Sequence, residues 1–234
     1  MKTKDIIIFG VCILIAALVL GIFFYKARTP QNTIRVTGYA TQGFESDMVK
    51  WSFAVSRSVG LKDIKTGYQL LTQDMDLLIT DLEMNGIDTS EISIQTPSTQ
   101  PQYNRDGQIS GYNIRQNIFV ISHNLKTVEK LALKPDFIYE KGIIMEYSNL
   151  EYNYAKIADL KKELLADATK DAMNRALEIS KSSGAKLGKM VSARQGVFQI
   201  TEPYSTEVSD YGVYSTTTKK KNITVTVTAS FIIK

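Results

Sequence analysis

Apolar and polar residues alternate with a period of two in several stretches of the chain, which is the pattern of a strand with one buried face. The clearest stretch is SGYNIRQNIFVIS, residues 110–122. Its apolar row consists of Tyr112, Ile114, Ile118 and Val120. Gln116 interrupts this row, and Asn113, Arg115 and Asn117 fall on the opposite face. We predict a strand here, whose polar row is either a solvated outer face or a surface that contacts another molecule.

The same reasoning predicts the remaining elements. Further strands are expected at IRVTGYA (34–40), VKWSFAV (49–55), EISIQT (91–96), GIIMEY (142–147), KMVSAR (189–194) and NITVTVTASFIIK (222–234). Apolar residues at helical spacing predict helices over about 64–82, 124–133 and 155–183, and Asn124 is suited to cap the second of these. The order ββαββαβαββ therefore predicts an α+β fold, with a largely antiparallel sheet packed with two longer helices and one short helix.

The N-terminal region contains an uninterrupted apolar run, IIIFGVCILIAALVLGIFFY, from Ile6 to Tyr25. A helix of about 20 residues is long enough to cross a bilayer core of roughly 30 Å. A buried core helix of this length is rarely apolar on all sides. A cleaved signal peptide, the nearer alternative, has a shorter apolar region that ends in small residues. We therefore predict a single uncleaved transmembrane helix, with a membrane anchor at 1–28, a linker at 29–33, a domain at 34–234 and lipid contact through residues 6–25.

The charges beside this run do not settle its orientation. Lys2 and Lys4 precede it and Lys26 and Arg28 follow it, so the positive-inside count is balanced. The short N-terminal tail favours an exported domain, and we predict a single-pass protein of the bacterial inner membrane whose domain faces the periplasm or exterior. Without residues 1–28 the chain has 24 basic and 23 acidic side chains. This near balance predicts no nucleic-acid partner, because phosphate binding needs a concentrated basic excess.

Residues suited to catalysis are few. His123 is the only histidine, and the only cysteine, Cys12, lies inside the apolar run. A histidine metal cluster is therefore impossible, and a Ser-His-Asp triad would depend on His123 alone. No phosphate-binding glycine motif occurs. We predict no catalytic, cofactor-binding or metal-binding residues and no enzymatic activity, with a hydrolase that uses His123 as a minor alternative.

The stretch 195–218 is rich in serine, threonine and tyrosine. Tyr204, Tyr211 and Tyr214 recur within it, and aromatic side chains are enriched in the cores of interfaces. Two readings stay open: a mobile loop, or a surface that contacts a ligand or partner.

Five motifs occur along the chain in one order: IRVTGYA, NGIDTSEISIQTPSTQPQY, SGYNIRQNIFV, an alanine-rich helix ending in SSGAKLGKMVS, and VTVTASFII. Each motif alone is weak, but together they cover about 200 residues and resemble the SIMPL domain family, which includes bacterial periplasmic immunogenic proteins and YggE-type proteins. The sequence departs from the family pattern at Ser46, where the family often has proline, and at Glu91, where it has aspartate.

The resemblance implies an α+β fold, export to the cell envelope and, in some members, assembly into ring-shaped oligomers. It implies no established enzymatic activity, and only indirect links to oxidative stress. We therefore expect a membrane-anchored structural protein of the cell envelope that self-associates as a homo-oligomer. The alternative is a ligand- or partner-binding envelope module that uses the tyrosine-rich loop 199–218.

Overall fold

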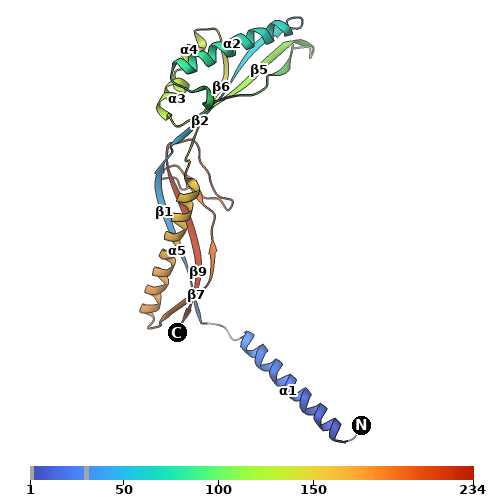
Figure 1. Ribbon diagram of the computed structural model, residues 1–234, viewed down its shortest axis with the longest axis vertical. Coiled ribbons are helices and arrows are strands. Elements are labelled where there is room, and N and C mark those ends of the chain that lie inside the picture. Colours follow the sequence, from blue (N-terminus) through green and yellow to red (C-terminus); the bar gives the residue numbers. More distant parts are fainter. Residues whose placement is uncertain (1–2, 29–31) are drawn as a thin grey trace. The chain divides into compact units, whose positions relative to one another are not determined.

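The computed structural model describes residues 3–28 and 32–234, with side chains described at 10–25 and 32–234 (Figure 1). In these residues the α-helices are α1 (Thr3–Arg28), α2 (Ile64–Met84), α3 (Leu125–Leu133), α4 (Asp136–Tyr139) and α5 (Ile157–Ser182), and Thr89–Glu91 forms a short 3-10 turn. The strands are β1 (Thr33–Glu45), β2 (Met48–Gly60), β3 (Ile92–Ile94), β4 (Ser98–Tyr103), β5 (Ile109–Ser122), β6 (Ile144–Asn153), β7 (Leu187–Gln195), β8 (Gln199–Thr201) and β9 (Lys220–Ile233). The predicted α+β class with antiparallel strands is confirmed.

The strands form two sheets, where the sequence predicted one. The first has the order β3-β5-β2-β6, with β4 also paired to β5, and the second has the order β1-β9-β7, with β8 also paired to β9. The chain passes from one sheet to the other at Ser46 and Asp47. The Ser46 amide donates to the Lys219 carbonyl, and the Asp47 carboxylate accepts from the Ala155 amide at 2.8 Å. The sequence reasoning that predicts strands at 34–40 and 49–55 also predicts a hairpin turn between them, at Gly43 and the stretch 45–47. In the structure this stretch is instead a crossing point between the sheets.

The described chain divides into two compact units, each with a core of its own. Unit 1 comprises Met1–Gly38, Thr169–Gln195 and Val227–Lys234, and unit 2 comprises Tyr39–Ala168 and Gly196–Thr226. β1, α5 and β9 each contribute residues to both units.

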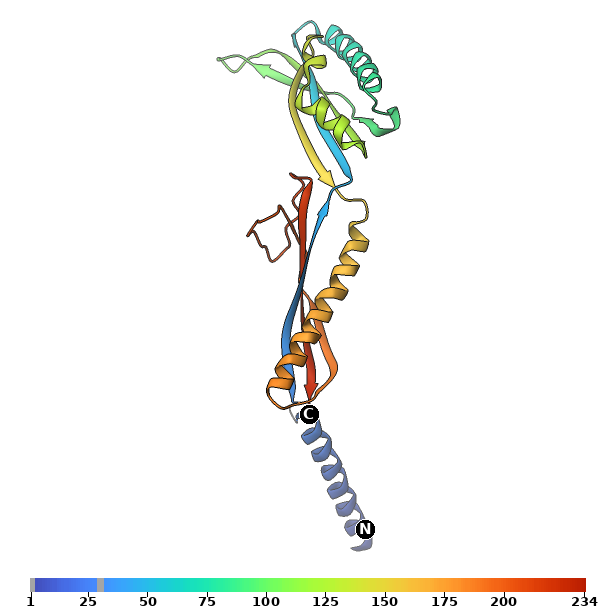
Figure 2. The ribbon, with the colours of Figure 1, turned by 90° about the vertical axis from the view of Figure 1, so that its left-hand side faces the viewer.

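Unit 2 contains a large core between its five-stranded sheet and the helices α2 and α3 (Figures 1 and 2). The inward residues of β5, among them Ile114, Ile118 and Val120, are fully buried, which confirms the predicted alternation. They lie beside Trp51 and Phe53 of β2, because Val120 pairs with Trp51 and Ile118 with Phe53. α2 adds Leu71, Met75, Leu78 and Leu82 to this core. The predicted cap of α3 is also confirmed, since the Asn124 side chain accepts from the Thr127 amide at 3.3 Å.

Unit 1 contains a much smaller core. Its buried cluster consists of Val36, Ala172, Ala176, Ala229 and Phe231. Ala172 and Ala176 form an alanine stripe on α5 that faces Ala229 of β9, and these small side chains leave little volume between helix and strand. α5 therefore lies close against the sheet. Phe231 is the largest of these five side chains, and the partly buried Ile34 and Leu187 pack against the cluster.

The N-terminal segment is helical, but the predicted transmembrane helix is corrected. Among the residues that the structure describes, no helix combines the length and the apolar character needed to cross a membrane. Most of the predicted linker, residues 29–31, and the side chains of Lys2, Lys4, Lys26 and Arg28 lie outside the described residues.

Candidate interaction surface

The polar row of β5 lies on the outer face of the five-stranded sheet, above a central strand with small side chains. β2 presents Ala54, Ser56 and Ser58 on this face, opposite Asn117, Arg115 and Asn113 respectively. Small side chains on the central strand allow longer ones from β5 and β6 to meet above it. Ala54 and Ser56 are buried as a result.

Asn113 and Arg115 both contact Glu146 of β6. The Asn113 amide donates to Oε1 of Glu146 at 2.7 Å, and Nε of Arg115 lies 3.1 Å from Oε2. The Arg115 contact is an ion pair without hydrogen-bond alignment. The guanidinium carbon also lies 5.1 Å from the ring centre of Tyr147, a cation–π distance.

Asn117 completes the row with two further contacts. Its amide donates to the side-chain oxygen of Gln95 at 3.0 Å, and its oxygen accepts from the Tyr147 hydroxyl at 3.4 Å. All three predicted residues of the row therefore have partners within unit 2. A role as a contact surface for another molecule stays a prediction.

The tyrosine-rich loop differs from this row, because its aromatic side chains point into solvent. Tyr204 is 100% exposed and Tyr211 is 98% exposed, and Val208 between them is 78% exposed. In Figure 2 the loop stands out from the sheet beside the start of β9. Tyr214 belongs to the base of the loop: it bridges to Ile200, and the amine of Lys161 lies 6.0 Å from its ring centre. The structure thus separates two displayed tyrosines from a third that supports them.

Two side chains at the start of the loop hold its shape. The Gln199 amide donates to the Ser209 carbonyl at 2.7 Å, and its side-chain oxygen accepts from the Val213 amide at 2.9 Å. The Glu202 carboxylate accepts from the hydroxyls of Ser215 and Thr217. These hydroxyls, Ser215 first, lower the pKa of Glu202 to about 2. The two arms of the loop are therefore joined by two sets of hydrogen bonds, one from Gln199 and one from Glu202.

Tyr204 has the one positive φ found among the described non-glycine residues, at 65°. The Ser205 amide donates to the Glu202 carbonyl at 3.2 Å, which closes a four-residue turn with Pro203 and Tyr204 at its centre. The third position of a turn with positive φ is normally glycine or asparagine, and another residue costs about 1 kcal/mol or more. A wholly exposed tyrosine offers no packing that would offset this cost within the chain.

A second polar cluster in unit 2 involves the lysine run before β9. Lys219 contacts Glu129 at 2.5 Å, and the Tyr152 hydroxyl donates to the same carboxylate at 2.6 Å. Lys221 is 2% exposed and donates to the Tyr152 carbonyl, and burial lowers its pKa. Desolvation raises the pKa of Glu129, but its contacts with Lys219 and Tyr152 lower the pKa by a larger amount, so the pKa lies below its usual value.

Sequence reasoning did not identify this cluster, although a signal for Lys221 was available. Lys221 shares the period-two row of Ile223 and Val225, which are buried. A charged residue at a buried position of a strand pattern indicates a partnered lysine. Glu129 and Tyr152 come from distant parts of the chain, and no local pattern links them to it.

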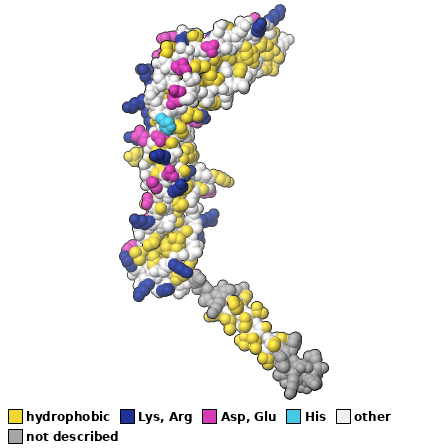
Figure 3. Space-filling view, viewed as in Figure 1, with side chains coloured by type: hydrophobic (Ala, Val, Ile, Leu, Met, Phe, Trp, Pro, Cys, Tyr) yellow, Lys and Arg dark blue, Asp and Glu magenta, His cyan; other side chains and the backbone are white. Residues whose placement is uncertain are grey.

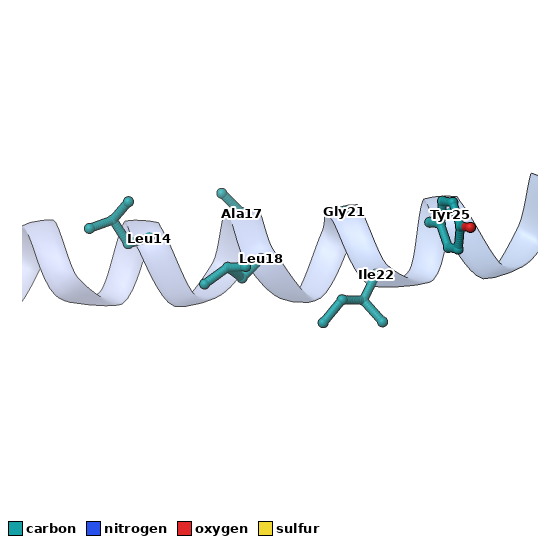
Figure 4. Close-up of a pocket in the computed structure, with 6 residues that line it drawn as sticks. All are labelled: Leu14, Ala17, Leu18, Gly21, Ile22 and Tyr25. Carbon is teal, nitrogen blue, oxygen red and sulfur yellow. The ribbon is translucent and has the colours of Figure 1, made fainter.

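A shallow groove of about 560 Å³ lies between β1 and α5 within unit 1. Its lining consists of Arg35, Val36, Thr37, Asn174, Arg175, Glu178 and Ile179. β1 is at the edge of its sheet, and Ile179 is half exposed. A second hollow, along one face of α1, is lined by side chains at helical spacing from Leu14 to Tyr25 (Figure 4). It is open to one side and contains no polar side chain other than the Tyr25 hydroxyl.

Comparison with known families shows to which family the chain belongs. A family model described as SIMPL, a protein of unknown function (DUF541), matches residues 34–231. The chain belongs to the SIMPL family. No match was found among curated proteins.

Charge divides unevenly between the two units of this SIMPL chain. Residues 32–38, 169–195 and 227–234 of unit 1, which we call the β/α part, have eight basic and two acidic side chains, a net charge of +6. Unit 2 has sixteen basic and twenty-one acidic side chains, a net charge of −5. Figure 3 shows several basic side chains gathered where α5 and β7 meet. The overall charge of +4 conceals this separation.

Nδ1 of His123 lies 2.8 Å from the Asp47 carbonyl, next to the crossing point between the sheets. Within the described side chains, no three His, Cys, Asp or Glu residues gather at metal-binding distances. The features described so far are a displayed aromatic loop, an open groove, a polar cluster around Glu129 and Tyr152, and two units of opposite net charge.

Proposed function

We propose that this SIMPL chain is a structural protein of the cell envelope, facing the periplasm or exterior, that self-associates without a catalytic role. The observation that carries the proposal is the separation of charge, with +6 on the β/α part of unit 1 and −5 on unit 2. Each copy has a positively charged part and a negatively charged part. The positive part of one copy therefore attracts the negative part of another. A link to envelope or oxidative stress stays a prediction from the family resemblance.

Charge of this size acts mainly on encounter and on register. Complementary potentials raise association rates and exclude pairings that bring like charges together. The contact joins different surfaces on the two partners, and such a contact closes into a ring when the rotation between copies permits and otherwise extends as a filament. Both outcomes are structural assemblies, and a ring is the closed form that we propose.

Sedimentation of the full chain at two salt concentrations tests the proposal. The experiment uses a mild detergent, which covers the exposed apolar side chains of α1. At about 10 mM salt, where charges act over roughly 30 Å, we expect a concentration-dependent assembly. At about 1 M salt, where the range is roughly 3 Å, the assembly should form more slowly and a smaller fraction of the chain should be assembled. A chain that sediments as a monomer at low salt over the whole concentration series contradicts self-association.

A second candidate function is supported by the loop. Tyr204 and Tyr211 are displayed by a loop that Gln199 and Glu202 hold in place, an arrangement suited to contacting an envelope ligand or partner. Purified envelope components can be titrated against the wild-type chain and against a Tyr204→Ser, Tyr211→Ser double variant. Binding that is lost in the double variant, while the wild-type chain stays monomeric at low salt, favours this function over self-association.

A further inference from the structure

The tyrosine-rich loop of unit 2, residues 199–218, has its shape fixed within the chain itself. Its aromatic side chains are already displayed, and the Gln199 and Glu202 contacts hold the backbone before any partner arrives. A binding element that is ordered in advance loses less conformational entropy on association. Tyrosine adds to this advantage, because it offers a large contact area with few rotatable bonds.

The groove of unit 1 matches the chemistry of a tyrosine side chain. Ile179, which is half exposed, provides apolar contact for the ring, and the guanidinium groups of Arg35 and Arg175 are suited to stack on its face. Glu178 and Asn174 lie in the same lining and can accept a hydrogen bond from the phenol. The groove is open, so an aromatic side chain reaches it without displacing any part of the chain.

Charge also favours this pairing. The stretch 196–218 contains Glu202, Glu207 and Asp210 and no basic residue. The β/α part of unit 1, which forms the groove, has a net charge of +6. An acidic loop that approaches a basic surface is attracted, and the same loop is repelled by the surface of unit 2, whose net charge is −5.

We propose that Tyr204 and Tyr211 of one copy dock in the groove between β1 and α5 of a second copy. This inference rests on the proposed self-association and names the two surfaces that meet. The contact is heterologous, because a loop on one partner meets a groove on the other. The resulting pair still has one free loop and one free groove, on different copies, so the assembly grows until it closes.

Two variants and a mixture test the pairing in full chains in mild detergent at low salt. The loop variant, Tyr204→Ser with Tyr211→Ser, keeps the groove, and the groove variant, Ile179→Glu, keeps the loop. Removal of a central aromatic anchor weakens binding by about 30-fold or more. We therefore expect each variant alone to be monomeric at concentrations where the wild-type chain assembles. Mixed together, the two variants should form a one-to-one dimer that cannot grow, because one intact loop meets one intact groove.

Matched controls separate this contact from general surface effects. Met173→Glu adds the same charge to α5 at a residue that is half exposed and does not line the groove. Tyr139→Ser removes a half-exposed tyrosine of α4, outside the loop. Both controls should assemble as the wild-type chain does, and unchanged thermal unfolding of all variants shows that the fold is kept.

The outcomes distinguish the two proposals. A wild-type assembly that neither variant weakens overturns the docking inference and leaves self-association standing. Loss of assembly in the loop variant without rescue in the mixture also overturns it, because the loops then contact each other and the groove is not used. A wild-type chain that stays monomeric contradicts the proposed function itself.

Discussion

Unit 2 and unit 1 achieve their folds with cores of different kinds. The core cluster of unit 2 contains seventeen buried side chains, with Trp51 and Phe53 among the fully buried ones. The cluster of unit 1 contains five, and three of these are alanine. Since hydrophobic stabilisation grows with the apolar area removed from water, unit 2 has the larger reserve of stability. In unit 1 the alanines let α5 pack close to the sheet. The surface of this unit has a net positive charge and contains the groove.

The largest expected effect comes from removing the principal aromatic ring of each core. Phe53→Ala should lower the unfolding free energy of unit 2 by about 4 kcal/mol, because a large cavity remains among rigid neighbours. Phe231→Ala should cost unit 1 about 3 kcal/mol, since its small cluster can collapse further. Calorimetry should show that each substitution lowers one of two transitions. A single transition that both variants shift equally would mean that the two units unfold as one.

Ion pairs extend the comparison. In unit 2 the Asp74 carboxylate, 7% exposed, receives two hydrogen bonds from Arg57, which raise the pKa of that guanidinium. Asp74→Ala should destabilise the protein by about 3 kcal/mol, because Arg57 loses its partner in a largely desolvated site. In unit 1 the Lys181–Glu178 pair is 61% and 70% exposed, and Glu178→Ala should cost less than about 1 kcal/mol. Urea unfolding measures both, and equal losses would remove this difference between the units.

Close packing in unit 1 makes a further distinction testable. Ala172 is fully buried against the sheet, whereas its neighbour Met173 is 52% exposed. Ala172→Leu should destabilise unit 1 by about 2 kcal/mol, because the added atoms force α5 away from the sheet. Met173→Leu, a substitution of similar volume on the solvent side, should change stability by less than about 0.5 kcal/mol. A tolerated leucine at 172 would show that α5 packs less tightly than the alanine stripe implies.

Features that depend on neighbours in the sequence were predictable. The strand around Ile114 and Ile118, the cap at Asn124 and the long helix with its alanine stripe all follow from local periodicity or local hydrogen bonding. β6 shows where this reasoning stops. Its apolar pattern ends at Tyr147, yet the strand continues to Asn153 because β2 pairs with it along its whole length.

The two sheets and the polar contacts of the site depend on residues far apart in the chain. The crossing point is fixed by partners more than a hundred residues away, because Ser46 bonds to Lys219 and Asp47 bonds to Ala155. Composition indicated Tyr204, Tyr211 and Tyr214 as candidates for a contact surface, without separating Tyr214 from the other two. It did not indicate that Gln199 and Glu202 would hold the loop that displays them, since side-chain contacts to a loop backbone leave no periodic pattern.

The smallest expected effect is a local response of this loop to acid, which unit 1 should not share. Serine and threonine hydroxyls that donate to the Glu202 carboxylate lower its folded-state pKa to about 2, below an unfolded value of about 4.3. A lowered pKa means that the stabilising contact is complete above about pH 4.3 and is lost as the pH falls through about 2. Carboxyl-carbon NMR should therefore give a Glu202 midpoint near pH 2, and the Val213 amide, which donates to Gln199 in the same loop, should shift in step with it. Glu202→Gln should remove this step from the Val213 signal, whereas Glu207→Gln, which removes an equal charge from the same loop, should leave it in place. A Glu202 midpoint near pH 4.3 would show that the carboxylate does not hold the loop. The loop would then depend on the Gln199 hydrogen bonds alone.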